Sequence, residues 1–82
     1  MQKLYIWGRG QDAEKLMELS PFLRMLVDGI IDSARKEETE TFWGKPVYRK
    51  EDIEWTREVY VIIATRQYYS EIADFLEIQN LR

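Results

Sequence analysis

A short apolar segment that runs directly into two glycines is the feature that most restricts how this chain can fold. Leu4-Tyr5-Ile6-Trp7 is rich in residues that favour β-strands, and Gly8-Arg9-Gly10 follows it without a spacer. Glycine adopts backbone conformations that other residues disfavour, so the pair predicts a tight turn at the end of a strand.

The residues after the glycines are spaced as in an amphipathic helix. Ala13, Leu16 and Met17 are apolar at i, i+3 and i+4, and Asp12 precedes them as a candidate N-cap. Ser20, which precedes a proline, is expected to end the helix because the α conformation is disfavoured there. The two segments together predict a strand–turn–helix unit.

The rest of the chain alternates between strand and helix patterns. The expected elements are a strand over Val27–Ile31, a polar loop over 33–41, a turn over Gly44–Pro46 with an extended piece at 47–48, a short helix over 51–56, a strand over Val59–Ala64 and a helix over 68–78. The segment 22–26 fits either a helical turn or the start of the second strand. The run 59–64 is continuously apolar, which is typical of a strand covered on both faces of a parallel sheet.

The two later helices carry predictions about burial. Ile53 is expected to point inward from the short helix. On the last helix the inward positions are Tyr69, Ile72, Ala73 and Leu76, and the solvent positions are Glu71, Asp74 and Glu77.

This alternation predicts right-handed crossovers and a parallel sheet with helices on both faces. We expect an α/β fold, a three-layer Rossmann-like domain with a short, mainly parallel three-stranded sheet in the order 2-1-3. The first strand would lie in the middle. A length of 82 residues fits one domain over 1–82, either standalone or a fragment of a larger protein.

Composition excludes several classes of function. The net charge is −3, from 12 basic and 15 acidic residues, and no basic stripe stands out, so we expect no nucleic-acid partner. Cysteine and histidine are absent, which removes the usual zinc and haem ligands and predicts no metal. The apolar runs are shorter than the roughly 20 residues of a spanning helix, and the N-terminus has no signal-peptide pattern. We therefore expect a cytoplasmic protein without membrane insertion.

The glycine turn matches a ligand-binding pattern. Gly8-Arg9-Gly10-Gln11-Asp12-Ala13 fits G-x-G-x-x-(G/A), the fingerprint of dinucleotide-binding turns. Gly8 permits the turn, Gly10 leaves room for a pyrophosphate, and Ala13 lets the helix pack closely on the strand. Free amides at the helix N-terminus attract phosphate oxygens. Such turns also persist as plain structure, so the pattern leaves both interpretations open.

Residues after the second and third main strands complete the predicted site. Asp32 lies roughly 20 residues after the turn, where the fingerprint places a ribose-binding carboxylate. Its charge disfavours a 2′-phosphate and therefore favours NAD over NADP. The alternative interpretation is that Asp32 is a solvated residue at the end of the strand. Thr65 and Arg66 follow the third main strand, and Arg66 and Arg9 can each pair with a phosphate or remain solvated. The predicted nucleotide-binding residues are Gly8, Arg9, Gly10, Gln11, Asp12, Ala13, Asp32, Ser33, Thr65 and Arg66, with NAD or another nucleotide as ligand.

Four segments occur in an order that resembles one family. They are Tyr5–Gly10, Gly29–Ser33, Trp43–Tyr48 and Tyr60–Thr65. The chain looks like the small Rossmann-like domains of bacterial surface-polysaccharide biosynthesis, of nucleoside-diphosphate-sugar epimerase-like or CoA-binding-like type. Such domains occur in sugar acetyltransferases and attached to methyltransferases and glycosyltransferases, and further strands usually follow them. The resemblance covers Lys3 to Leu76 and implies that Gly8, Gly10, Asp32 and Thr65 face a nucleotide.

Catalytic patterns are missing from the sequence. None of the five tyrosines has a lysine four residues later, so the Tyr-x-x-x-Lys pair of dehydrogenases and sugar epimerases is absent. Without histidine, the serines lack their usual activating base. We expect a non-catalytic module that binds a nucleotide or nucleotide-sugar. If it is part of an enzyme, we expect an NAD-dependent epimerase/dehydratase-like protein or a sugar-modifying transferase.

Two alternatives remain open from the sequence. One is a ligand-free structural or oligomerisation domain, since free sheet edges invite a homodimer or a fused enzyme domain. The other is the cofactor half of an enzyme completed by another polypeptide. Four aromatic residues, Trp43, Trp55, Tyr68 and Tyr69, are candidates either for stacking on a base or for core packing.

Overall fold

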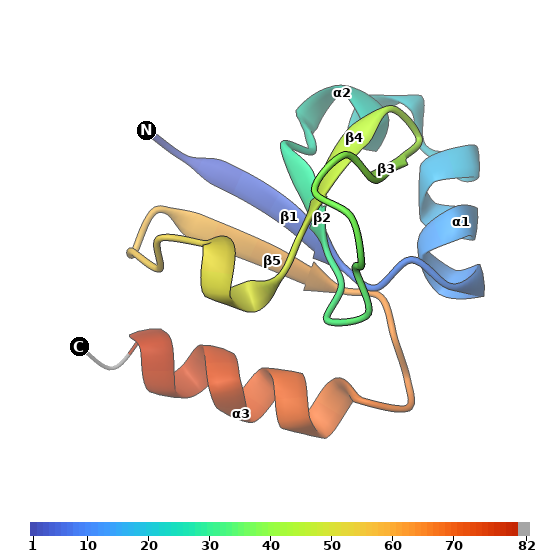
Figure 1. The fold of residues 1–82 in the computed structure, drawn as a ribbon. Helices are drawn as coiled ribbons and strands as arrows, with labels where there is room; N and C mark the ends of the chain where they lie inside the picture. The colour runs from blue at the N-terminus through green and yellow to red at the C-terminus, as the bar shows by residue number, and fades with distance from the viewer. Residues whose placement is uncertain (81–82) are drawn as a thin grey trace.

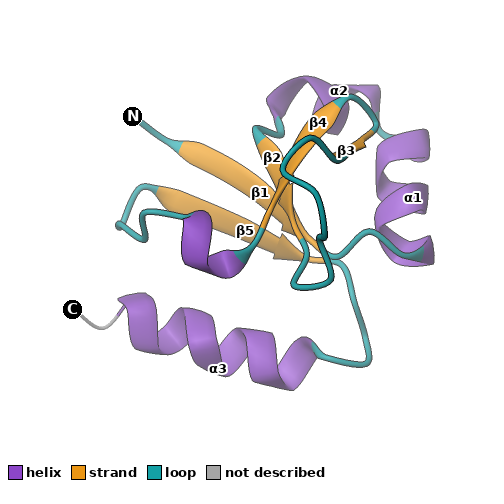
Figure 2. Cartoon of the chain, viewed as in Figure 1, coloured by secondary structure: helices purple, strands orange, loops and turns teal. Residues whose placement is uncertain are grey.

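The computed structural model describes residues 1–80, and these form one mixed sheet with three α-helices and a short 3-10 helix (Figures 1 and 2). In chain order the elements are β1 (Lys3–Trp7), α1 (Gln11–Leu19), α2 (Pro21–Leu26), β2 (Gly29–Ile31), β3 (Thr41–Phe42), β4 (Lys45–Tyr48), the 3-10 helix η1 (Lys50–Asp52), β5 (Val59–Ile63) and α3 (Tyr69–Asn80).

The sheet has the strand order β3-β4-β2-β1-β5. Strand β1 is parallel to β2 and β5, β2 is parallel to β4, and β3 is antiparallel to β4. The predicted three-stranded, mainly parallel sheet of a three-layer Rossmann-like domain is therefore wrong, because the described residues form a five-stranded mixed sheet. The two extra strands, β3 and β4, depend on the pairing of β4 with β2 and of β3 with β4, which local sequence patterns do not predict.

The β3–β4 hairpin explains part of this error. Trp43 and Gly44 connect the two strands and have φ angles of 53° and 75°. Two-residue hairpin loops of this kind need positive φ at both positions. Lys45 and Pro46, predicted as part of the turn, instead belong to β4, where Pro46 lies opposite Thr41.

The second main strand is shorter than predicted. Residues 21–26 form α2, and β2 begins only at Gly29. Ser20 ends α1, as expected, and also caps α2, where its Oγ accepts a hydrogen bond from the amide of Leu23 at 3.1 Å. Proline at the first helical position suits this start because its missing N–H has no helical partner anyway.

Helix boundaries differ in two further places. The N-cap of α1 is Gly10 and not Asp12, which lies in the first helical turn. The helix predicted over 51–56 is the 3-10 helix η1, which ends at Asp52, although Ile53 is buried as predicted. In α3 the predicted inward position Tyr69 is wrong, since its exposed fraction is 55%, whereas Ile72 is buried.

The core has one cluster on each face of the sheet. On one face Ile6, Ile30 and Val47 pack with Ala13 and Met17 of α1. On the opposite face Tyr5, Trp7 and Ile31 pack with Ile53 and with Ile72 of α3. Figure 1 shows α1 and α2 on one side of the sheet and α3 on the other.

Strand β5 contacts the core on both faces, as its continuous apolar sequence predicts, through Ile62 on one face and through Val59, Val61 and Ile63 on the other. It is nevertheless the last strand of the sheet order. Its five residues are partly exposed, and the exposed fraction of Tyr60 is 52%. An apolar strand of this kind at a sheet edge is unusual.

Candidate functional site

A crevice of about 1090 Å³ lies where β1, β2 and β5 end and α1 begins. Parallel strands bring their carboxyl ends to the same edge of a sheet, so the segments after Trp7, Ile31 and Ile63 meet there. Nine of the ten predicted site residues line this crevice: Gly8, Arg9, Gly10, Gln11, Asp12, Asp32, Ser33, Thr65 and Arg66. The tenth, Ala13, is fully buried in the core cluster that contains Ile6.

The two positions of the turn that hold glycine differ in how strictly the fold requires it. Gly8 has φ +117°, and a Cβ added to it would lie 2.9 Å from the carbonyl oxygen of Ala64. The fold itself therefore requires glycine at position 8. Gly10 has φ −88°, and a Cβ there would meet no atom within 4 Å. Because Gly10 lines the crevice, the space beside its backbone is open to a ligand.

The first turn of α1 offers backbone donors at the edge of the crevice. The helical hydrogen bonds begin with the amide of Glu14, which donates to the carbonyl of Gly10 at 3.0 Å. The amides of Gln11, Asp12 and Ala13 precede this bond, so they have no acceptor within the helix. No side chain caps the helix at Gly10. The helix dipole adds partial positive charge at this end.

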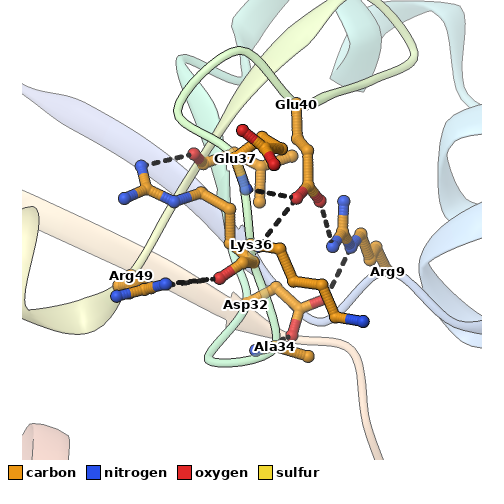
Figure 3. A network of polar contacts seen from close by, with 9 residues as sticks. Arg9, Asp32, Ala34, Lys36, Glu37, Glu40 and Arg49 are labelled. Carbon is orange, nitrogen blue, oxygen red and sulfur yellow. Dashed lines mark hydrogen bonds and ion pairs between the residues drawn. The ribbon is translucent and has the colours of Figure 1, made fainter.

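Arg9 binds two carboxylates, as Figure 3 shows. Its Nε lies 2.6 Å from Oδ2 of Asp32, and its terminal nitrogen lies 2.5 Å from Oε1 of Glu40. The other oxygen of Glu40 accepts hydrogen bonds from the amides of Lys36 and Glu37, both at 2.7 Å. The Arg9 network, formed by these five residues, joins the glycine turn, the end of β2 and the following loop.

The Arg9 network shifts the pKa values of Glu40 and Arg9. The amides of Glu37 and Lys36, and then Arg9, lower the pKa of Glu40 to about 2. The pKa of Arg9 is raised, above all by its hydrogen bond to Glu40. Arg9 and Glu40 are therefore both charged at neutral pH.

Asp32 is not a freely solvated strand end. Besides Arg9, it accepts a hydrogen bond from the amide of Ala34 on Oδ1 at 2.9 Å. Each carboxylate oxygen keeps a second lone pair, so Asp32 can still accept a hydroxyl. Arg9, by contrast, is engaged by two anions. Glu40 was not predicted as a site residue, because its contact with Arg9 depends on the path of the loop.

Three further cationic side chains line the crevice: Lys15, Lys50 and Arg66. Arg66 is 93% exposed, and its Nε lies 3.6 Å from Oδ2 of Asp12. The ammonium of Lys50 lies 5.0 Å from the centre of the Phe75 ring. Neither lysine was predicted as a site residue. Helical spacing could have indicated Lys15, because it lies one turn after Gln11 on α1.

The four candidate aromatics lie in different places. Tyr68 is half exposed and lines the crevice. Trp55 stacks on Trp7 with ring centres 6.1 Å apart and donates to the carbonyl of Lys50, so it belongs to the core. Trp43 lies in the β3–β4 turn, where its Nε1 donates to Glu14 at 3.1 Å. The fourth, Tyr69, borders a separate apolar pocket beside the crevice.

The described residues contain neither a candidate metal site nor a helix that could span a membrane. Within residues 1–80 no three Asp, Glu, His or Cys side chains are grouped in a way that could hold a metal ion. Over the same residues, no helix combines the length and apolar character needed to cross a membrane.

The fold and crevice define a small α/β domain whose mixed sheet presents a glycine turn and a helix N-terminus at its carboxyl edge. The family model described as C2185-like, N-terminal matches residues 1–81, and the chain belongs to this family. No curated protein and no solved structure matches the chain. The resemblance to Rossmann-like domains of surface-sugar biosynthesis stays a prediction.

Proposed function

We propose that the crevice binds a nucleotide or nucleotide-sugar, with the diphosphate over the first turn of α1. One observation carries the proposal: Gln11 and Asp12, whose amides precede the first helical hydrogen bond and have no side-chain cap, line a crevice of about 1090 Å³ beside open space at Gly10. Backbone amides at a helix N-terminus are suited to phosphate oxygens by both geometry and partial charge.

The charges around this turn fit an anion, with one opposing group. Lys15, Lys50 and Arg66 supply positive charge along the crevice. Asp12 opposes an anion because its carboxylate lies in the first turn of the helix. Arg66 partly offsets that charge through its 3.6 Å ion pair with Asp12. A diphosphate can therefore draw Arg66 away from Asp12, since the arginine is highly exposed.

Other residues that line the crevice suit a ribose and a base. Asp32 keeps lone pairs for ribose hydroxyls after its contacts with Arg9 and Ala34. Asp32 and Glu40 together outweigh the charge of Arg9, which disfavours a 2′-phosphate and favours an NAD-like ligand. Tyr68 is half exposed at the crevice and offers a ring on which a base can stack.

We assign the module a binding role without catalysis of its own. The chain lacks histidine, cysteine and the Tyr-x-x-x-Lys pair, which supports this assignment. The resemblance to surface-polysaccharide biosynthesis domains supports nucleotide-sugars as ligands and a role beside a sugar-modifying enzyme. The lack of cysteine is compatible with a cytoplasmic location. A ligand-free structural domain is the competing function.

Mapping of amide chemical shifts by NMR, with NAD, a UDP-sugar and coenzyme A added separately, tests the proposal. The expected result is saturable movement of the amides from Gly8 to Ala13 with at least one ligand, together with Asp32 and Thr65. Saturation at Gly8 to Ala13 by a diphosphate-containing ligand, without a response to adenosine alone, would locate the diphosphate. If none of the three ligands moves these amides, the proposal is wrong and the ligand-free alternative stands.

Two variants test whether the diphosphate binds over the first turn of α1. Gly10→Ser adds a Cβ where the folded chain has room but where the diphosphate would lie, and its hydroxyl competes for the helix amides. It should weaken binding while the chain stays folded. Lys15→Gln should also weaken binding. Its charge-matched control is Lys3→Gln at the far end of β1, which should leave binding unchanged.

A further inference from the structure

The two edges of the sheet differ in how they are protected from pairing with another strand. At one edge β3 has two residues, and the neighbouring β4 contains Lys45 and Pro46. Short edge strands, lysine and proline are devices that discourage edge-to-edge pairing. At the other edge β5 has five residues, all aliphatic except Tyr60, with no charge, proline or glycine. This edge lacks the devices that protect the first.

Hydrogen bonds at the ends of β5 show which backbone groups face β1. The carbonyl of Glu58 accepts from the amide of Lys3 at 2.9 Å. Six residues later, the amide of Ala64 donates to the carbonyl of Trp7, also at 2.9 Å. Backbone polar groups alternate in direction along a strand, so the even-numbered residues of β5 point toward β1.

The odd-numbered residues therefore point away from β1, although the amide of Val59 already donates to the carbonyl of Thr56 at 3.2 Å. The amides and carbonyls of Val61 and Ile63 point away from β1, toward an edge where no strand of residues 1–80 pairs. Unpaired backbone groups of this kind form a template for an added strand. Tyr60, which is 52% exposed, leaves apolar surface beside the same edge.

We infer that a second copy of the chain occupies this edge, with β5 antiparallel to β5 of the partner around a two-fold axis at Val61. In this register Val61 lies opposite Val61 of the partner subunit. The amide of each Val61 therefore donates a hydrogen bond to the carbonyl of the other. Tyr60 lies opposite Ile62 of the partner subunit, and Val59 opposite Ile63 of the partner subunit. The inference is independent of the proposed nucleotide site.

The sequence of β5 is self-complementary in this arrangement. Each opposed pair joins β-branched residues or an aromatic with a β-branched residue, which are favourable cross-strand pairs. No charged residue lies within β5, so the two-fold axis places no like charges opposite each other. The faces also match, because Val59, Val61 and Ile63 pack toward the α3 side in both copies, whereas Ile62 packs on the α1 side.

Sedimentation velocity over a range of concentrations, combined with amide hydrogen exchange, tests this inference. We expect a monomer–dimer equilibrium in which the amides of Val61 and Ile63 become protected roughly tenfold or more as the dimer forms. The amides of Tyr60 and Ile62 serve as internal references, because they face β1 at every concentration. A chain that stays monomeric at NMR concentrations, with freely exchanging Val61 and Ile63 amides, contradicts the inference.

Three variants separate this edge from other apolar surfaces. Val61→Pro removes an outward amide, and Tyr60→Lys adds a charge opposite Ile62 of the partner subunit without changing the backbone. Both should give monomers, and circular dichroism should show an unchanged fold for Tyr60→Lys. Phe22→Glu, on the exposed face of α2, should leave the dimer intact. A dimer that resists both β5 variants but dissociates with Phe22→Glu overturns the proposed interface.

Discussion

The guanidinium Nε of Arg9 lies 2.6 Å from Oδ2 of Asp32, which joins the glycine turn after β1 to the end of β2. The two side chains are 25% and 20% exposed, so water screens the pair only in part. Arg9 also binds Glu40 of the next loop. A residue inside a ligand-binding pattern therefore also stabilises the fold around the crevice.

The Arg9–Asp32 pair should contribute measurably to stability. A double-mutant cycle with Arg9→Gln and Asp32→Asn should give a coupling energy of about 1 kcal/mol, between the values typical of exposed and of fully buried pairs. Urea unfolding of the four proteins measures it. Additive effects of the two substitutions would show that the pair contributes nothing.

Glu40 should make stability dependent on pH in the acid range. Its pKa falls from the usual 4.5 to about 2 in the folded chain, so its contribution is fully present above pH 4.5. That contribution should be lost as the pH falls from 4.5 toward 2, because protons then bind the unfolded state first. Urea unfolding of the wild type and of Glu40→Gln should give free energies that converge over this range. Curves that stay parallel from pH 7 to pH 2 would refute the effect.

The two glycines of the turn should respond differently to substitution. Gly8→Ala should destabilise the chain by roughly 1–3 kcal/mol, because φ +117° and the close carbonyl of Ala64 both oppose a Cβ. Gly10→Ser should be neutral or slightly stabilising, since serine is a good N-cap and the added Cβ meets nothing. Thermal unfolding of both variants measures the difference. Equal losses at the two positions would mean that the turn has another conformation in solution.

A pair of substitutions in α1 tests the packing of the core. Met17→Ala should cost about 2–5 kcal/mol, because Met17 is fully buried between α1 and the sheet. Leu19→Ala, two residues later and 79% exposed, should change the stability by less than about 0.5 kcal/mol. Similar losses of stability for the two variants would show that α1 packs on the sheet through another face.

The carboxylate of Asp12 should lower the affinity of the proposed site for an anionic ligand. Asp12→Asn removes the carboxylate in the first turn of α1, and it should tighten binding of a diphosphate-containing ligand roughly two- to fivefold. Isothermal titration calorimetry with the ligand found by NMR provides the measurement. Asp74→Asn, on the exposed face of α3, is the charge-matched control and should have no effect. Weaker binding after Asp12→Asn would mean that Asp12 contacts the ligand.

The predicted site and the observed crevice share most of their residues for a simple reason. The glycine turn and the ends of two parallel strands carry the predicted positions, and parallel pairing with β1 brings those ends together. Glu40 and Lys50 were missed because they reach this region through a loop and the η1 helix. Their approach depends on the path of the chain and not on spacing within an element.

The sequence by itself determined the strand–turn–helix unit at the N-terminus, the run of β5 and the inward face of α3 around Ile72. These features depend on local periodicity and on glycine and proline, whose effects extend over a few residues. Only the tertiary structure decided that β4 and β3 extend the sheet, that β5 lies at an edge, and that Arg9 binds Asp32 and Glu40. Strand pairing and these ion pairs join residues that are far apart in the sequence. They therefore contribute to the free energy of folding only when the whole chain has folded.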